Sequence, residues 1–144
     1  LKHLDVSNNT QLTKLLCGNN QLTHLDVSNN TQLTELSCYD NQLTHIDVSN
    51  NTLLTDLYCR NNQLTHIDVS NNILLTGLYC RNNSLTQLDI SNNTRLSHFS
   101  CEDNPGDSGQ FRVKAWFEES DIPSEFTRYS WYYLGTEVRV IYYK

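Results

Sequence analysis

The sequence has few of the residues that separate domains: only two prolines and five glycines occur among its 144 residues. No Pro/Gly/Ser-rich stretch is long enough to act as a linker, so we expect one continuous domain. Long apolar runs are also absent. Their absence argues against a transmembrane segment and a signal peptide within this sequence, and no wall-anchor motif is present.

Positive charge is scarce as well, with ten Lys and Arg residues against sixteen Asp and Glu residues. The resulting net charge of −6 argues against binding to nucleic acid or to anionic membrane surfaces. The sequence contains no nucleophile paired with a base, no metal-ligand spacing and no phosphate-binding loop. We therefore expect a protein that is not an enzyme and has neither a cofactor nor a metal.

The strongest positive signal is a row of cysteines that recur every 21 residues, at Cys17, Cys38, Cys59, Cys80 and Cys101. Residues 12–22 read LTKLLCGNNQL, which matches the leucine-rich pattern L-x-x-L-x-L-x-x-N/C-x-L with Cys17 in place of the third leucine. The same pattern begins again at Leu33, Leu54, Leu75 and Leu96. A fixed period of this kind predicts stacked copies of one unit.

Each 21-residue unit also contains a shorter copy of the phrase, such as LTHLDVSNN at residues 22–30. Two extended segments and two asparagine corners fill the unit and leave no room for a helix. We therefore predict a mostly β, right-handed leucine-rich repeat solenoid of about five coils over residues 1–104. Its neighbouring strands would lie about 4.8 Å apart.

The cysteines stand at leucine positions, where a buried cysteine behaves as a small hydrophobic residue. Disulfides would need Cβ atoms about 3.8 Å apart, and an odd number of cysteines cannot all pair. Zinc needs four ligands that converge, whereas stacked cysteines lie in a line. A reactive thiolate needs exposure and a nearby cation. We interpret the row as interior packing.

The phrase LTHLDVSNNTQLTELSCYDNQL resembles the cysteine-ladder leucine-rich repeats of bacterial surface proteins, above all the internalin-type adhesins. The match runs from Leu1 to about Asn104. It implies an exported, surface-associated protein whose repeats bind another macromolecule, and it does not identify the ligand. Because the sequence begins partway through a repeat, we expect it to be a fragment or a processed form.

The outward positions of the shorter segments barely change from coil to coil. They read His-x-Asp four times, from His3 and Asp5 to His66 and Asp68, and then Gln87 and Asp89. We expect a solvated row in which neighbouring side chains compensate one another. A strip of divalent-metal sites is the alternative, although nothing closes a coordination shell.

The cysteine-bearing segments differ, because their outward positions vary. Tyrosine and arginine, the residues most enriched at binding hot spots, gather in the middle coils. We predict a ligand-binding face there, in which acidic residues accompany the aromatic and basic ones. Its residues are Tyr39, Tyr58, Tyr79, Arg60, Arg81, Asp56 and Glu35. The alternative is that the tyrosines only pair across strands and that the arginines balance Asp40, Asp56 and Glu35.

The repeat stops at Asn104, where NPGDSG marks a turn. Residues 111–117 alternate as a strand, and residues 129–134 and 137–143 read as a hairpin. We predict that residues 105–144 form a C-terminal β-hairpin cap on the last repeat. The aromatic side chains there favour packing over the alternative of a sugar-binding platform formed by Trp116, Trp131, Tyr132 and Tyr142.

These observations favour a non-enzymatic, adhesion-type recognition module of a bacterial surface or secreted protein. We expect it to be an extracellular or cell-surface monomer that binds a protein or a glycan and does not insert into membranes. The alternative is the substrate-recognition region of a secreted effector enzyme whose catalytic domain lies outside this sequence.

Overall fold

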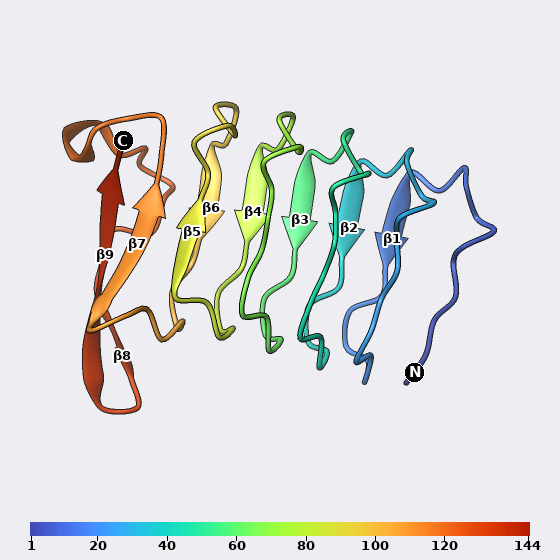
Figure 1. Cartoon of the computed structure of the whole chain (residues 1–144), viewed down its shortest axis with the longest axis horizontal. Coiled ribbons are helices and arrows are strands. Elements are labelled where there is room, and N and C mark those ends of the chain that lie inside the picture. The colour runs from blue at the N-terminus through green and yellow to red at the C-terminus, as the bar shows by residue number, and fades with distance from the viewer.

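The computed structural model describes residues 1–144 and shows a mostly β solenoid, with its two termini at opposite ends of a stack of coils (Figure 1). Five three-residue strands form a parallel sheet in the order β1-β2-β3-β4-β6. Their bounds are β1 Lys14–Leu16, β2 Glu35–Ser37, β3 Asp56–Tyr58, β4 Gly77–Tyr79 and β6 His98–Ser100. Leu36 lies opposite Leu57, and Leu57 lies opposite Leu78. The predicted stack of about five 21-residue coils is confirmed.

The leucine in the middle of each strand points inward because side chains alternate along an extended segment. Leu36, Leu57 and Leu78 have no solvent exposure, and one continuous core runs the length of the molecule. All five cysteines are free and buried in this core, as the sequence predicted. Burial raises the pKa of Cys17 to about 11 and raises the pKa values of the other four thiols well above their ordinary value. These thiols are therefore neutral packing groups.

The opposite side of the solenoid carries the His-x-Asp segments and differs from the prediction. Only the last copy forms a regular strand, β5 Gln87–Asp89. The first four copies are extended but are not joined in a ladder, and the corners hold successive coils together. The backbone N–H of Gln42 donates to the Leu22 carbonyl at 2.9 Å, and the side-chain Nδ2 of Asn51 donates to the Val27 carbonyl at 3.0 Å. The cysteine-bearing segment thus forms a strand in every coil, whereas the His-x-Asp segment forms one only in its last copy.

After Asn104 the chain keeps winding, in longer coils. Strand β7 Gln110–Lys114 lies parallel to β5, and β9 Thr136–Tyr143 lies parallel to β7. Strand β8 Trp131–Tyr133 returns antiparallel along β9. A short 3₁₀ helix, η1 Glu119–Asp121, is the one helical element, and the chain contains no helix long and apolar enough to cross a bilayer. The predicted strand and hairpin both form, whereas the capping role of residues 105–144 stays a prediction.

Aromatic side chains connect this segment to the last repeat. Phe126 packs edge-on against Phe99 of β6, with ring centroids 5.4 Å apart. Trp131 and Tyr142 are buried, and they donate hydrogen bonds to the carbonyls of Asn104 and Thr127, both at 2.7 Å. The platform of Trp116, Trp131, Tyr132 and Tyr142 is therefore wrong as a group, because two of its members lie in the core.

Candidate binding face

The corner that follows each cysteine holds the strands in register. An asparagine occupies every copy, and its amide is fully used in the interior coils. Asn83 Nδ2 donates to the carbonyls of Cys59 and Cys80 at 3.0 Å, and its Oδ1 accepts from the Leu64 amide at 3.0 Å. Each amide therefore joins its own coil to the coil before it, which fixes the outer face of the sheet.

A second corner feature escaped the sequence analysis. The residue before each of these asparagines has a positive φ of 51° to 61° in every copy. Asparagine and aspartate tolerate this left-handed conformation better than other residues with a side chain. The recurrence of asparagine or aspartate at this position was the sequence signal that could have predicted the positive φ. The residues are Asn19, Asp40, Asn61, Asn82 and Asp103.

The seven residues predicted for the binding face lie together on the outer side of the five-stranded sheet, and all are half-buried. We call this surface the tyrosine face. Tyr58 and Tyr79 are direct neighbours in register, and their rings stack with centroids 4.7 Å apart and planes 3° from parallel. Burial raises the pKa values of both phenols, and the Asp56 carboxylate adds to the effect. Both hydroxyls therefore remain protonated hydrogen-bonding groups at neutral pH.

Glycines make room for these rings. A Cβ atom on Gly77 would lie 2.7 Å from Asp56 Oδ1 and 2.9 Å from Tyr79 Cε2, and a Cβ on Gly18 would lie 2.7 Å from the Tyr39 ring. All three distances are shorter than real contacts of a Cβ atom allow. Gly18 and Gly77 therefore leave the space that the Tyr39 and Tyr79 rings occupy.

The charged groups of the face are only partly paired. Glu35 pairs with Lys14 at 2.9 Å, and Arg81 pairs with Glu102 at 3.7 Å. Arg60 lies over the Tyr39 ring, 5.0 Å from its centroid, and forms no ion pair. The arginines therefore do not balance Asp40, Asp56 and Glu35 as the alternative expected, whereas Tyr58 and Tyr79 do pair across strands as it expected.

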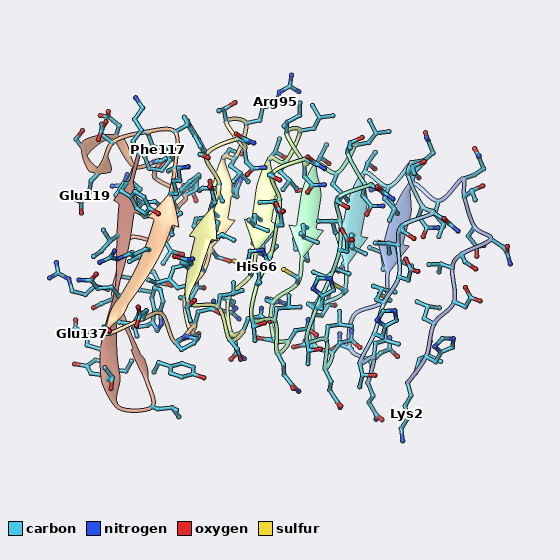
Figure 2. All side chains as sticks on the ribbon, viewed as in Figure 1. Lys2, His66, Arg95, Phe117, Glu119 and Glu137 are labelled. Atoms are coloured by element: carbon cyan, nitrogen blue, oxygen red, sulfur yellow. The ribbon has the colours of Figure 1, made fainter.

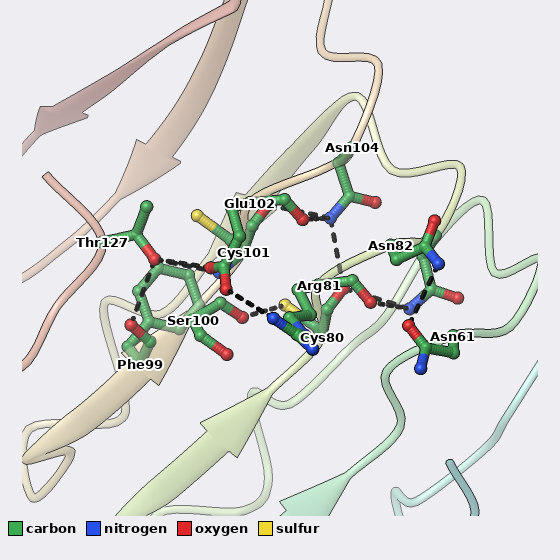
Figure 3. A network of polar contacts seen from close by, with 11 residues as sticks. Asn61, Cys80, Arg81, Asn82, Phe99, Ser100, Cys101, Glu102, Asn104 and Thr127 are labelled. Carbon is green, nitrogen blue, oxygen red and sulfur yellow. Dashed lines mark hydrogen bonds and ion pairs between the residues drawn. The ribbon is translucent and has the colours of Figure 1, made fainter. Parts of the chain in front are cut away.

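A shallow hollow of about 390 Å³ opens beside the tyrosine stack. It is lined by Tyr58, Arg60, Tyr79, Arg81, Ser100 and Glu102. Sequence reasoning did not select Ser100 and Glu102. Glu102 is buried: its Oε2 accepts a hydrogen bond from the Thr127 hydroxyl at 3.0 Å, and its Oε1 faces Arg81 (Figure 3). Glu102 is the one acidic residue among the equivalent outward positions of the five coils, which otherwise hold glycine, tyrosine and arginine. That difference was the sequence signal that could have drawn attention to Glu102.

The His-x-Asp row lies on the other side of the solenoid, where Figure 2 shows His66. Each aspartate accepts a hydrogen bond from the amide of the serine two residues later, at 2.9 Å in all five copies. Hydrogen bonding to these serines, first to the side chain and then to the backbone, lowers the pKa values of the first four aspartates. At Asp89 burial opposes the shift, but Ser91 and Lys114 outweigh it and the pKa is also lowered. No group of three or more His, Cys, Asp or Glu side chains is placed to hold a metal. The carboxylates therefore act as hydrogen-bond acceptors within the turns that follow them.

Comparison with solved structures identifies the type of repeat. The functional domain of InlJ from Listeria monocytogenes, which includes a cysteine ladder, is 41% identical over 78% of this chain with a TM-score of 0.73. The repeats of this chain are similar to internalin-type cysteine-ladder repeats. The internalin InlF from Listeria monocytogenes is 33% identical over 69% of the chain, with a TM-score of 0.63. The chain spans 27% of the InlJ chain and 31% of the InlF chain.

Two further comparisons add less. The LVIVD repeat profile matches residues 17–41 and 79–101, two segments of about one coil each. Together they cover about a third of the chain. No curated protein matches the sequence.

Proposed function

We propose that this chain is a non-enzymatic recognition module of a bacterial surface or secreted protein, and that it binds a macromolecule through the tyrosine face. The stacked pair of Tyr58 and Tyr79 beside the unpaired Arg60 carries the proposal. Aromatic and arginine side chains supply most of the binding energy at protein interfaces. Both similar structures are internalins, which supports a surface-exposed recognition role over the alternative of an effector's substrate-recognition region.

The charges of the hollow indicate what a ligand would present. Arg81 already contacts a buried carboxylate, whereas Arg60 is held against the Tyr39 ring with its hydrogen-bond donors uncommitted. A carboxylate accepts two parallel hydrogen bonds from a guanidinium group. We therefore expect an acidic group of the partner at Arg60 and an apolar or aromatic group across the edges of the tyrosine stack. A protein ligand offers both.

The test compares two double variants of the intact chain. Immobilised Tyr58→Ala/Tyr79→Ala protein and a control with His24→Ala/His45→Ala on the opposite side would be exposed to labelled surface proteins of host or neighbouring cells. We expect the tyrosine variant to lose a bound protein that the parent and the histidine control both retain. Equal retention by all three would contradict the proposal. Unchanged melting temperatures would show that each variant is folded.

A further inference from the structure

We propose a second binding site, for a neutral sugar, on the opposite side of the solenoid, where β7 and β9 extend it beyond β5 (Figure 1). Two hollows lie next to each other there and share Gln110 and Arg112. The larger measures about 480 Å³ and the smaller about 370 Å³. Both fall within the range of ordinary ligand sites, roughly 300–1,000 Å³. We call the two hollows together the β7 trough.

The trough begins where the repeated His-x-Asp pattern changes. The first four copies place histidine at the outward position, and the fifth places Gln87 there. Gln87 lies opposite Arg112 in the register of β5 and β7. The larger hollow thus takes one wall from the last repeat and the other from the segment that follows it.

A rigid loop forms one end of the larger hollow and presents Asp107. Gly106, Ser108 and Gly109 all have positive φ angles, and a Cβ on Gly106 would lie 2.3 Å from the Gln110 carbonyl oxygen. The Gly106 amide donates to the Leu85 carbonyl, and the Asp107 and Gln110 backbones exchange two hydrogen bonds of 2.7 and 2.9 Å. The turn read from the sequence as NPGDSG therefore fixes the backbone from which the exposed Asp107 side chain projects.

The trough is lined by side chains of opposite charge that do not form an ion pair with each other. Arg112 donates twice to Gln110 Oε1, at 3.2 and 3.1 Å, which orients its guanidinium group. Arg112 and Asp107 line the same hollow, yet neither belongs to an ion pair. Asp107 Oδ1 accepts a hydrogen bond from the neighbouring Ser108 hydroxyl at 3.0 Å, so Asp107 Oδ2 and the remaining donors of Arg112 are left for water or for a ligand.

This lining favours sugar hydroxyls over other ligand chemistries. None of the six residues around the larger hollow is hydrophobic, so it lacks the apolar centre of a protein interface or of a drug-like pocket. Asp107 would repel an anion, and Arg112 would repel a cation. A hydroxyl donates and accepts together, and so satisfies both groups. In the smaller hollow, Ile141 and Tyr143 offer an apolar surface for the C–H face of a sugar ring.

The test uses the intact chain, labelled with ¹⁵N, and the methyl glycosides of galactose, mannose and N-acetylglucosamine as separate probes. We expect at least one glycoside to shift the side-chain amide signals of Gln87 and Gln110. Asp107→Ala and Arg112→Gln should each weaken that binding about tenfold or more, because each loses a charge-assisted hydrogen bond. Arg95→Gln, at a distant corner of the stack (Figure 2), should bind like the parent.

Three outcomes would overturn the proposal. One is that no glycoside shifts these signals. A second is that Asp107→Ala and Arg112→Gln bind as the parent does while keeping its melting temperature. The third is that sodium sulfate or calcium chloride shifts the signals and the glycosides do not, which would make the trough an ion site. Tyr58→Ala/Tyr79→Ala should bind the glycoside normally, so the two binding surfaces are tested separately.

Discussion

At the scale of single residues, the two asparagine rows differ in how much of each amide they use. In the row after the cysteines, both the amide nitrogen and the amide oxygen bind backbone groups. In the row after the His-x-Asp segments, only the nitrogen does. Asn72 Nδ2 donates to Val48 O at 3.0 Å and to Asn51 O at 2.8 Å, but its buried Oδ1 has no partner. The second row therefore supports the fold with part of its amide unsatisfied.

Replacing Asn72 with alanine tests this row against its neighbour. The change removes one donor from each of two buried carbonyls, which keep their backbone donors Asn51 N and Leu54 N. We expect the loss of these two hydrogen bonds to lower the free energy of unfolding by about 1–3 kcal/mol. Asn71→Ala, an exposed control that makes a single bond of 3.3 Å to Ser49 O, should cost less than about 0.5 kcal/mol. Urea unfolding measures both. Equal losses would contradict the assigned role of Asn72.

Thiol reactivity tests the cysteine row. Cys17 is 5% exposed and has a pKa of about 11, whereas Cys38, Cys59, Cys80 and Cys101 are fully buried, and burial raises their pKa values well above the ordinary value. With a disulfide reagent near pH 8, we expect Cys17 to react first and the other four to react only as the chain unfolds. Mass spectrometry of peptides locates the label. Labelling of Cys59 as fast as Cys17 would show that the interior row is open.

Most of the fold could be predicted from the 21-residue period of single residues. The 21-residue intervals from Leu36 to Leu57 and from Cys38 to Cys59 predicted which side chains point inward, because equivalent positions in a stack share one environment. The partners of Arg60 and Arg81 were not predictable in this way. Long side chains choose among several neighbours, and Glu102 becomes available only because Thr127, 25 residues later, returns to hold it.

At the scale of the element, strand β4 shows how a missing side chain shapes its neighbours. Gly77 begins the strand, and the space above it is occupied by Asp56 and the Tyr79 ring. The sequence placed Gly77 in its outward column without showing why glycine was needed there. The reason is that the Tyr79 ring of the same strand and the Asp56 carboxylate of the preceding coil lie over it.

Gly77→Ala should therefore disturb the tyrosine stack more than the strand. The added methyl group must displace Asp56 Oδ1 and Tyr79, and we expect a change in the tyrosine near-ultraviolet circular dichroism with an unfolding cost of about 1–3 kcal/mol. Ser100→Ala, which also lies on this face but makes no side-chain hydrogen bond, is the control. An unchanged spectrum in Gly77→Ala would mean that the rings are not packed over this residue.

At the scale of the whole molecule, each coil contacts only the coils beside it, so the last coil depends on what covers it. Phe126 contacts the rings of Phe99, Trp116, Phe117 and Tyr142. The sequence predicted a cap of aromatic residues and the hairpin within it. It did not predict that β7 and β9 would continue the winding, because the repeat pattern is lost after Asn104 and the new coils are longer.

The proposed capping role is tested by Phe126→Ala. We expect a loss of about 3–5 kcal/mol, the usual cost of removing a buried phenylalanine side chain, and a faster reaction of the Cys101 thiol. Tyr129→Ala, at a side chain that is 60% exposed, is the control and should have little effect. If Cys101 stayed as protected in Phe126→Ala as in the parent, residues 105–144 would not act as a cap.

Stability should also fall in acid. Hydrogen bonds from the neighbouring serines lower the folded-state pKa values of the exposed aspartates, so this contribution is present above their ordinary pKa of about 3.9 and is lost as the pH falls through the lowered values. The triple variant Asp26→Asn/Asp47→Asn/Asp68→Asn keeps the acceptor oxygens but does not titrate. Urea midpoints measured between pH 7 and pH 2 should decline less steeply in it than in the parent. Identical slopes would contradict this assignment.

The uniform register of β1 to β4 has an evolutionary consequence. The outward-facing residues of every coil lie over the same kind of leucine and cysteine core. A duplication or deletion of 21 residues therefore moves the outward-facing residues of all later coils by one strand spacing, about 4.8 Å, and leaves the packing of the core unchanged. Arg60 and Tyr79 can thus be brought nearer or set further apart in fixed steps. A lineage built on this scaffold can try new ligand contacts by shuffling whole coils, and can refine them afterwards by point mutation.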